Sequence, residues 1–377
     1  MPRAGLSAQG GLRVLIAGGG TGGHVIPALA IARELRDAHG AEVRFVGTSR
    51  GLETKLVPEA GFALDLIRVG QLKSVALMTR LKTLADLPLG MLRCAALLRR
   101  FKPDVVIGVG GYVSGPTMLA AIVMRVPTLA FEPNAVPGLA NRIVGRFVTA
   151  AAVNLRGTKR YFHGAEVTGI PVREEFFRIA DDGSMQSHGR WKQLLVFGGS
   201  QGARVLNEMM PQIAGKLLKA LPTLEIVHQT GGRQGDGTRA AYARAGLVGN
   251  GEEDRVRVHP YLDRMPEEFA EADLVLCRSG ASTMAELAAA GKASVLVPFP
   301  LAADDHQRKN AEAFVEAGAA VLLAEAELKP ERLLDVLREL LAEGAPLAGM
   351  GAKARELAHP RAVQEIVGMV LRLAGLA

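Results

Sequence analysis

Two glycine-rich turns, each set between a short apolar run and a helical pattern, constrain the fold of this chain more than any other feature. The first covers residues 18–24 and follows Val14–Ala17, and the second covers residues 198–202 and follows Leu194–Phe197. A strand, a tight turn and a helix in this order direct backbone N–H groups and a helix N-terminus at one point, where a phosphate is a common ligand. We therefore predict two α/β domains that face one central cleft and hold two phosphate-bearing molecules.

Apolar runs of strand length alternate with helical patterns along the whole chain, which indicates parallel sheets covered on both faces. A length of 377 residues suits two domains better than one core. The composition becomes polar between Ile170 and Arg190, and an amphipathic tail, Ala362–Leu376, follows Pro360. We predict a first domain of residues 1–172 that also receives a C-terminal helix at about 361–377, and a second domain of residues 173–360.

The excess of positive charge is concentrated in one segment. The formal net charge is +7, and seven bases lie between Lys73 and Lys102 with a single acid, Asp86. Apolar residues are interleaved with these bases, so the segment can lie on an anionic membrane surface, where each base contributes on the order of 1 kcal/mol. Nucleic acid is a poorer partner because the segment has one aromatic residue, Phe101, and a solvated helix face is the plain alternative. The expected membrane patch comprises Lys73, Met78, Arg80, Leu81, Lys82, Leu84 and Arg93.

Cysteine usage and hydropathy point to the cytoplasm. The two cysteines, Cys94 and Cys277, cannot build a disulfide framework, which suits a reducing compartment. The first residues are rich in glycine and do not resemble a signal peptide, and no apolar run approaches the roughly 20 residues of a spanning helix. We expect a cytoplasmic protein that meets a membrane peripherally.

The first turn formally matches the G-x-G-x-x-G pattern of dinucleotide-binding folds through Gly18, Gly20 and Gly23. A nicotinamide site also needs an acid after the second strand, and Glu42–Val46 is followed by Gly-Thr-Ser, which argues against NAD. His24 lies in the first helical turn, where the helix dipole disfavours a cationic imidazole. It is therefore a candidate proton acceptor, and a residue that merely caps the helix is the alternative.

Three further segments follow predicted strands. Residues 108–116 repeat the strand–turn–helix pattern, so two anion-directed turns in one domain fit a diphosphate, or a phosphate and a sugar; a strained turn is the alternative. In Arg278–Glu286, the terminal acid either stabilises a helix N-terminus or accepts hydrogen bonds from two ribose hydroxyl groups. Residues 304–310 are dense in donors and acceptors, as in a ligand site or a solvated loop. No Asp-x-Asp arrangement is placed to hold a metal, and we expect neither a metal nor a cofactor.

Five motifs taken together resemble the MurG family of N-acetylglucosaminyltransferases. They are Gly-Gly-Thr-Gly-Gly-His (19–24), Gly-Gly-Tyr-Val-Ser-Gly-Pro (110–116), Gly-Gly-Ser-Gln-Gly-Ala (198–203), Cys-Arg-Ser-Gly-Ala (277–281) and Asp-His-Gln-x-x-Asn-Ala (305–311). The resemblance covers nearly the whole chain and implies a GT-B fold of two Rossmann-like domains. It also implies UDP-GlcNAc in the second domain. In the first domain it implies undecaprenyl-diphosphate-linked MurNAc-pentapeptide (lipid I), bound at the cytoplasmic face of the bacterial inner membrane.

The resemblance implies roles for individual residues. Ser200, Gln201 and Arg173 would contact the donor diphosphate. Leu262 would contact the uracil through its backbone, and Glu286 would hold the ribose. The donor-binding set is completed by Thr21, Gly22, Asn134, Thr283, His306 and Gln307, the last two on the GlcNAc hydroxyl groups. The acceptor-binding set is Gly20, Gly23, Gly111, Tyr112 and Ser114.

In the implied reaction, the 4-hydroxyl group of MurNAc attacks the anomeric carbon of GlcNAc from the face opposite UDP, which inverts an α linkage to β. A base must take the hydroxyl proton, and the charge that develops on UDP must be stabilised. We predict that His24 is the base, with Glu132 as the second candidate. Arg173 and the turn that contains Ser200 would stabilise the leaving group without a metal.

One departure from the family pattern occurs before Asn134, where Phe131, Glu132 and Pro133 replace His-Glu-Gln. Roles tied to that histidine or glutamine therefore do not transfer to this chain. A UDP-GlcNAc 2-epimerase and a natural-product glycosyltransferase with a soluble acceptor are the enzymatic alternatives, and neither needs a cationic amphipathic segment. A membrane-bound scaffold that lacks catalysis is the non-enzymatic alternative, and the intact Glu286 argues against it.

Overall fold

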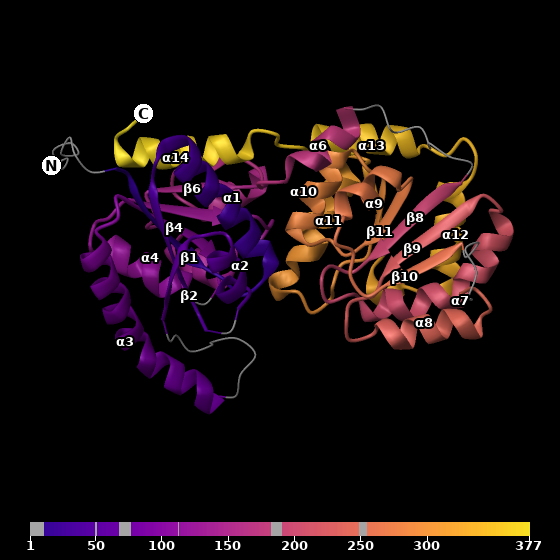
Figure 1. Cartoon of the computed structure of the whole chain (residues 1–377), viewed down its shortest axis with the longest axis horizontal. Helices are drawn as coiled ribbons and strands as arrows, with labels where there is room; N and C mark the ends of the chain where they lie inside the picture. The colour runs from indigo at the N-terminus through magenta and orange to yellow at the C-terminus, as the bar shows by residue number, and fades with distance from the viewer. Residues whose placement is uncertain (1–10, 50, 68–76, 112, 182–190, 249–254) are drawn as a thin grey trace. The chain divides into compact units, whose positions relative to one another are not determined.

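The structure is a computed structural model that describes residues 11–377 except 50, 68–76, 112, 182–190 and 249–254; the side chains of residues 77–88 and 181 also lie outside the description. The chain divides into two compact units, each with its own parallel sheet (Figure 1). The first contains Met1–Pro171 and Arg361–Ala377, and the second contains Val172–Pro360. The predicted α/β class with two parallel sheets is confirmed.

The first unit is built on a seven-stranded parallel sheet in the order β3-β2-β1-β4-β5-β6-β7. The strand order reverses between β1 (Arg13–Gly18) and β4 (Val105–Gly110), whose apolar residues are buried. Ligands of open α/β sheets bind at such a switch point, beyond the carboxyl ends of the strands. Both glycine-rich turns of this unit follow these two strands and therefore lie there. The remaining strands are β2 (Glu42–Gly47), β3 (Ala63–Leu66), β5 (Thr128–Glu132), β6 (Ala150–Val153) and β7 (Ala165–Val167).

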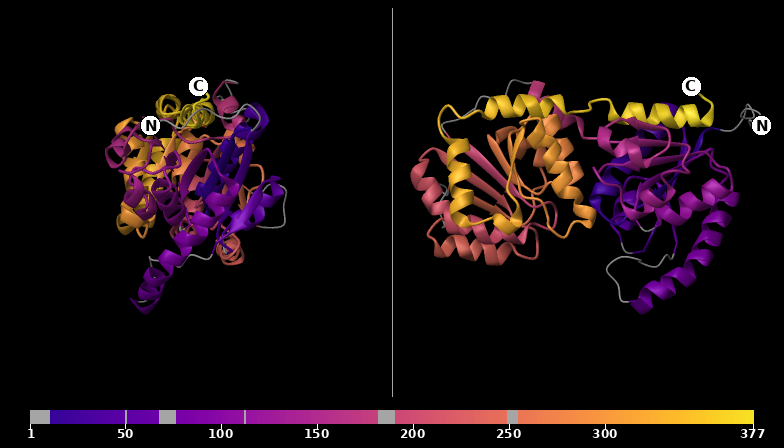
Figure 2. Two further views of the ribbon diagram at one scale, coloured as in Figure 1. Left: turned by 90° about the vertical axis from the view of Figure 1, so that its left-hand side faces the viewer. Right: turned by 180° about the vertical axis from the view of Figure 1, so that it is seen from behind.

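The helices of the first unit are α1 (Gly22–His39), α2 (Glu53–Glu59), α3 (Leu77–Phe101), α4 (Ser114–Val123), α5 (Leu139–Val144), the 3₁₀ helix η1 (Arg156–Tyr161) and α14 (Ala362–Ala374). Helix α14, at the C-terminal end of the chain, packs against α1 (Figure 2). An ion pair of 2.9 Å joins Arg372 of α14 to Glu166 of β7. The last residues of the chain thus complete the unit that the first residues begin.

The second unit is built on a six-stranded parallel sheet in the order β10-β9-β8-β11-β12-β13. Its order reverses between β8 (Lys192–Phe197) and β11 (Leu274–Cys277). The second glycine-rich turn follows β8, and the segment that begins at Arg278 follows β11, so both lie at the switch point of this sheet. The remaining strands are β9 (Leu224–Gln229), β10 (Val256–His259), β12 (Ser294–Leu296) and β13 (Ala320–Leu322).

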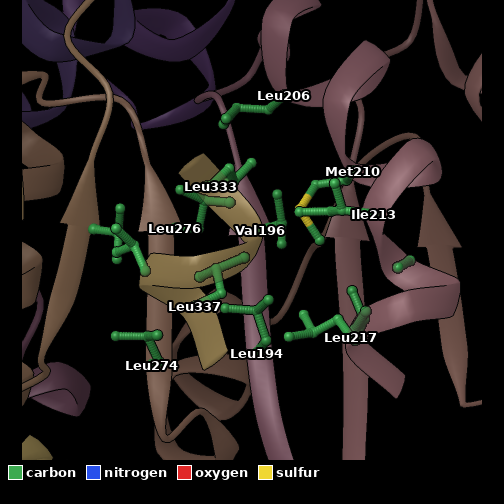
Figure 3. Close-up of a cluster of buried hydrophobic side chains, with 14 of the residues drawn as sticks. Leu194, Val196, Leu206, Met210, Ile213, Leu217, Leu274, Leu276, Leu333 and Leu337 are labelled. Atoms are coloured by element: carbon green, nitrogen blue, oxygen red, sulfur yellow. The ribbon is translucent and has the colours of Figure 1, made fainter. Parts of the chain in front are cut away.

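One face of the second sheet packs against α7 (Arg204–Ala220) and α12 (Pro330–Leu341). Leucines and valines of α12 recur at the spacing of one helical face and are buried against strand residues such as Val196 and Leu276 (Figure 3). The other helices are α6 (Glu174–Asp181), α8 (Gly235–Arg244), α9 (Met265–Glu271), α10 (Ala281–Ala290), α11 (His306–Glu316), α13 (Leu347–Glu356) and the 3₁₀ helices η2 (Ala303–Asp305) and η3 (Glu325–Glu327).

Most of the basic segment belongs to α3. Of the expected membrane patch, Arg93 is exposed. Lys73 lies outside the described residues, as do the side chains of Met78, Arg80, Leu81, Lys82 and Leu84. Within the described part of the chain, no helix combines the length and the apolarity needed to cross a bilayer.

Candidate active site

The two glycine-rich turns of the first unit pack against each other. Gly110 has a φ of +94°, and a Cβ atom there would lie 2.9 Å from Cε1 of His24. A Cβ atom on Gly111 would lie 2.6 Å from the backbone oxygen of Gly19. Glycine is therefore required at both positions, by conformation and by space. The imidazole of His24 lies directly against the turn that contains Gly110 and Gly111. The structure thus brings together two segments that lie about 90 residues apart in the sequence.

Gly20, which we predicted to contact the acceptor, has both of its peptide groups engaged inside the unit. Its N–H donates to Oε2 of Glu53 at 2.7 Å, and its carbonyl oxygen accepts the N–H of Leu52 at 3.3 Å. The first turn of α1 begins immediately afterwards, at Gly22 and Gly23, which are half-buried. The leading N–H groups of a helix have no intrahelical acceptor, so these two residues offer the turn's donors for a ligand.

Glu132, our second candidate base, is 2% exposed, and four donors satisfy its carboxylate. Oε1 accepts the backbone N–H and the side-chain amide of Asn134 at 3.0 and 3.2 Å. Oε2 accepts the N–H of Gly138 at 3.1 Å and the amide of Asn141 at 3.0 Å. Burial raises the pKa of Glu132, and these hydrogen bonds oppose that shift. The geometry favours a role in positioning Asn134 over the proton-accepting role that we predicted.

Ser114 and Tyr112 were also expected to contact the acceptor. Ser114, at the first position of α4, is fully buried, and its hydroxyl points toward Gly108, where a Cβ atom would lie 2.9 Å away. Its side chain therefore faces the interior, and only its backbone remains for an acceptor. Tyr112 lies outside the described residues. Phe131, at the position of the family's histidine, is completely buried in β5.

In the second unit, Ser200 and Gln201 are exposed at the tip of the turn that follows β8. The turn is braced from behind by the end of β9 and the residues that follow it. Gly202 has a φ of +73°, and a Cβ atom there would collide with the backbone oxygen of Thr230. The side-chain amide of Gln229 donates to the carbonyl oxygen of Gly199 at 3.2 Å. The position of Ser200 and Gln201 is thus fixed by contacts behind the turn.

A buried polar chain holds Thr230 in turn. The amide of Asn207 donates to the Thr230 carbonyl oxygen at 2.9 Å, which leaves its Oδ1 to accept from Nε2 of His228 at 3.1 Å. Nδ1 of His228 must then accept from the hydroxyl of Tyr242, 2.9 Å away. Burial lowers the pKa of His228 to about 3, so the ring stays neutral and this direction of donation persists across physiological pH.

Glu286 lies half-buried on α10, in the segment that follows β11. Burial raises the pKa of its carboxyl group to about 7, and the positive charge of Arg173 opposes that shift. Arg173 is exposed, and its guanidinium lies 5.1 Å from the ring centroid of Phe176. Thr283 is half-buried one turn before Glu286, whereas the side chain of Leu262 is 7% exposed and belongs to the core, which leaves its backbone for a ligand.

His306 and Gln307 open α11 after two residues in the left-handed conformation, Asp304 with a φ of 55° and Asp305 with a φ of 54°. Such conformations are uncommon outside glycine and concentrate at functional sites. Nδ1 of His306 donates to the carbonyl oxygen of Ala303 at 2.7 Å, because a carbonyl can only accept. In the neutral ring, Nε2 is then an acceptor, which suits a sugar hydroxyl group.

Gln307 is tied to the neighbouring loops. Its Oε1 accepts the N–H of Phe299 at 3.0 Å, and its carbonyl oxygen accepts the hydroxyl of Ser279 at 2.8 Å. Asn310, one turn later, donates to the Ser279 carbonyl oxygen at 3.2 Å. The side-chain N–H₂ of Gln307 is the group that remains for a ligand. We assigned no role to Asn310 from sequence, although it belongs to one of the five motifs.

Arg278 was also missed, although it too lies within a motif. It is 8% exposed, and its Nη1 donates to the carbonyl oxygens of Val297 and Pro298 at 3.0 Å each. An ion pair with Glu325 measures 2.5 Å. Arg278 therefore anchors the loop that leads to His306. An arginine directly after a predicted buried strand is the signal that the sequence offered, because such an arginine is rarely buried unless it is paired.

The second unit thus brings together, near one sheet switch point, the glycine turn of Ser200, the carboxyl group of Glu286 and the loop that leads to His306 and Gln307. The first unit offers paired glycine turns and an imidazole around the other. No cluster of three or more side chains suited to a metal ion occurs among the residues that the structure describes.

Comparisons with known proteins agree with this arrangement. The model of the glycosyltransferase family 28 N-terminal domain matches residues 14–153, and that of the C-terminal domain matches residues 193–366. A Solibacter usitatus protein named UDP-N-acetylglucosamine--N-acetylmuramyl-(pentapeptide) pyrophosphoryl-undecaprenol N-acetylglucosamine transferase is 45% identical over 96% of each chain. A Myxococcus xanthus protein of the same name is 41% identical over 96% of this chain and 93% of its own length. The crystal structure of Acinetobacter baumannii MurG superposes with a TM-score of 0.79 at 31% identity, covering 96% of this chain and 99% of that one.

Proposed function

This chain belongs to glycosyltransferase family 28 and is a UDP-GlcNAc-dependent N-acetylglucosaminyltransferase with the GT-B fold, and from that premise we propose how its residues divide the reaction. The second unit binds UDP-GlcNAc, and the first binds MurNAc-pentapeptide linked to undecaprenyl diphosphate. GlcNAc passes to the MurNAc 4-hydroxyl group with inversion, which yields lipid II and UDP for peptidoglycan synthesis.

The observation that carries this proposal is the pairing of a phosphate turn with a ribose carboxyl group on adjacent strands. The turn of Ser200 follows β8, and the segment of Glu286 follows β11, the neighbour of β8. A nucleoside diphosphate needs both kinds of group: backbone donors for phosphate and an acceptor for two ribose hydroxyl groups. The loop of His306 and Gln307 then supplies the acceptor and donor that sugar hydroxyl groups require. Leu262 and Thr283 line the same end of the sheet.

UDP leaves as an anion, and the second unit provides the charge that stabilises it. Arg173 is exposed and close enough to Glu286 to influence its pKa. The N-terminus of α7 follows the Ser200 turn and adds its dipole. These groups stabilise the pyrophosphate without a metal, as a preorganised electrostatic environment does in other enzymes.

In the first unit, His24 takes the proton of the attacking hydroxyl group, and Asn134 and Thr21 contact the sugar. Gly23 and Gly111 lie in the paired turns and approach the acceptor diphosphate through their backbones. The support for His24 is its place: it stands against Gly110 at the sheet's switch point. Glu132 acts on Asn134 rather than on substrate, since its four hydrogen bonds engage both carboxylate oxygens.

The enzyme acts peripherally at the cytoplasmic face of the membrane that holds its acceptor. Helix α4 contacts both α3 and α5. Among the described side chains of these helices and of the loops that follow α4 and α5, the large apolar ones that are exposed are Leu89, Leu92, Val123, Leu139, Ile143 and Phe147. Exposed arginines accompany them at 93, 125, 142 and 146. Apolar side chains ringed by bases suit an anionic lipid surface.

The test is UDP release from UDP-GlcNAc with and without a short-chain lipid I analogue, with the product linkage determined by NMR. The proposal expects release that depends on the acceptor and a β-1,4-linked disaccharide. Release without acceptor, together with ManNAc, would indicate an epimerase instead. Donor binding without turnover under either condition would indicate a scaffold.

A further inference from the structure

Glu53 is a buried acid that neither the motifs nor the proposed reaction uses. It is 1% exposed, at the start of α2. Oε2 accepts the N–H of Gly20 at 2.7 Å, and Oε1 accepts both the N–H and the hydroxyl of Thr48 at 3.0 Å. These hydrogen bonds lower the pKa of Glu53 although burial opposes them, so the carboxylate is ionised at neutral pH. Its known partners are neutral donors from two separate loops.

Three glycines from three segments leave room for this one side chain. A Cβ atom on Gly19 or Gly51 would collide with the carboxylate, and one on Gly47 would lie 2.6 Å from Cγ of Glu53. The carboxylate therefore fills the space between the turn after β1, the end of β2 and the start of α2. A buried carboxylate costs several kcal/mol unless its hydrogen bonds are complete. An apolar side chain could fill the same space without this cost, so packing alone does not explain a carboxylate beneath the glycine turn.

We propose that Glu53 is a positioning residue for the acceptor step, one that fixes the glycine turn bearing Thr21 and His24. The carboxylate holds the Gly20 amide, which is 33 residues away in sequence, and also the Thr48 amide, which is 5 residues away. It thereby links the turn after β1 to the end of β2. This sets the direction in which the chain enters α1, and hence the place of the residues that meet the acceptor. The inference rests on the proposed function, because it assumes that the acceptor binds at this turn.

The test compares Glu53→Gln with Asp104→Asn. A glutamine has the same shape but carries one acceptor oxygen, so either Gly20 or Thr48 loses its partner. Asp104 makes an analogous bond to the N–H of Arg13 at 2.8 Å, at the opposite end of β1 from the turn. Both variants neutralise a carboxylate that accepts a backbone N–H in the first unit, and only Glu53→Gln does so beneath the turn. Each is assayed for steady-state kinetics with the lipid I analogue, for UDP binding by calorimetry and for thermal unfolding.

We expect Glu53→Gln to raise the KM for the acceptor or lower kcat about tenfold or more, as the loss of one charge-assisted hydrogen bond allows. The UDP affinity should stay unchanged, and Asp104→Asn should keep wild-type kinetics at a similar loss of thermal stability. Equal kinetic losses in both variants, or none in Glu53→Gln, would overturn the assignment. If Glu53→Gln does not fold, Thr48→Val decides: it removes one donor to Oε1, and an unaltered acceptor KM would refute the role. If the wild-type enzyme showed no acceptor-dependent transfer, the proposed function itself would be refuted, and the role of Glu53 with it.

Discussion

The substitution Glu286→Gln should make the free protein more stable at alkaline pH and should weaken the binding of UDP-GlcNAc. Burial raises the pKa of this carboxyl group from 4.5 to about 7, so the folded state holds its proton more tightly than the unfolded state does. Wild-type stability therefore falls as the pH rises from about 4.5 through about 7, and the loss is complete above that range. A glutamine cannot ionise, so the variant escapes this loss.

The size of the effect follows from the shift. A raised pKa of this magnitude corresponds to roughly 3 kcal/mol between the two protonation states, at 1.36 kcal/mol per pH unit. Because Glu286 is half-buried, roughly 3 kcal/mol is an upper value. The second unit of Glu286→Gln should thus match the wild type near pH 5 and exceed it at pH 8, where a gain of 1 kcal/mol raises the Tm by about 2–4 °C.

Donor binding should change in the opposite direction. In the proposed donor site, an ionised Glu286 would accept hydrogen bonds from two ribose hydroxyl groups, and the single amide oxygen of glutamine would be a weaker acceptor. We expect the KM for UDP-GlcNAc to rise roughly ten- to a hundredfold, as about 1.5–3 kcal/mol of charge-assisted hydrogen bonding is lost. Wild-type affinity should also strengthen as the pH rises through about 7, and that of the variant should not.

Calorimetric unfolding and UDP-GlcNAc titration at pH 5, 6, 7 and 8 measure both effects on the same samples. Wild-type and variant Tm values that run parallel across this series would refute the argument from burial. An unchanged UDP-GlcNAc affinity in the titration would take Glu286 out of the donor site, whatever the unfolding data show. Asp335→Asn, on the outer side of α12, provides a control in which an acid is neutralised away from the site.

Three other outcomes follow from the same contacts. His24→Ala should lower kcat about a hundredfold or more and leave UDP-GlcNAc affinity intact, as removal of a general base does; near-normal turnover would transfer that role elsewhere. The triple change Arg80→Glu, Lys82→Glu and Arg93→Glu should release the protein from anionic vesicles in a sedimentation assay without altering donor affinity, and continued sedimentation would refute the membrane surface. Arg278→Met should destabilise the second unit by about 3 kcal/mol in urea unfolding, since it strands a carboxylate and two carbonyl groups; a change below about 1 kcal/mol would show that the loop is held by other contacts.

The glycine turns could be predicted from sequence because everything that defines them is local. An apolar run, a glycine cluster and a helical pattern follow one another within some 20 residues, as in Val14–Ala17 and the helix after it. Alternation of such units also fixes a parallel sheet and two domains.

The supporting side chains could not be predicted, because their partners are distant in sequence. Glu53 reaches Gly20 across 33 residues, and Asn310 reaches Ser279 across 31. No periodicity or spacing marks such pairs, since each depends on how two loops meet in three dimensions. The hydrogen bonds of Glu132 are local, two to nine residues away, but they were not visible in the sequence either, because they depend on how the loop after β5 folds back on the carboxylate.

These supporting carboxylates narrow the choice of the base. Glu53 and Glu132 both lie near the switch point of the first sheet. Both carboxylate oxygens of each residue accept hydrogen bonds from N–H groups of the same unit. A carboxylate whose lone pairs are engaged in this way must break a buried hydrogen bond before it can take a proton. Breaking that bond would destabilise the loop that the carboxylate holds. Among the described side chains of the paired turns, His24 is a half-buried titratable group whose ring lies against Gly110. We therefore expect the two acids to hold the loops in place and His24 to accept the acceptor's proton.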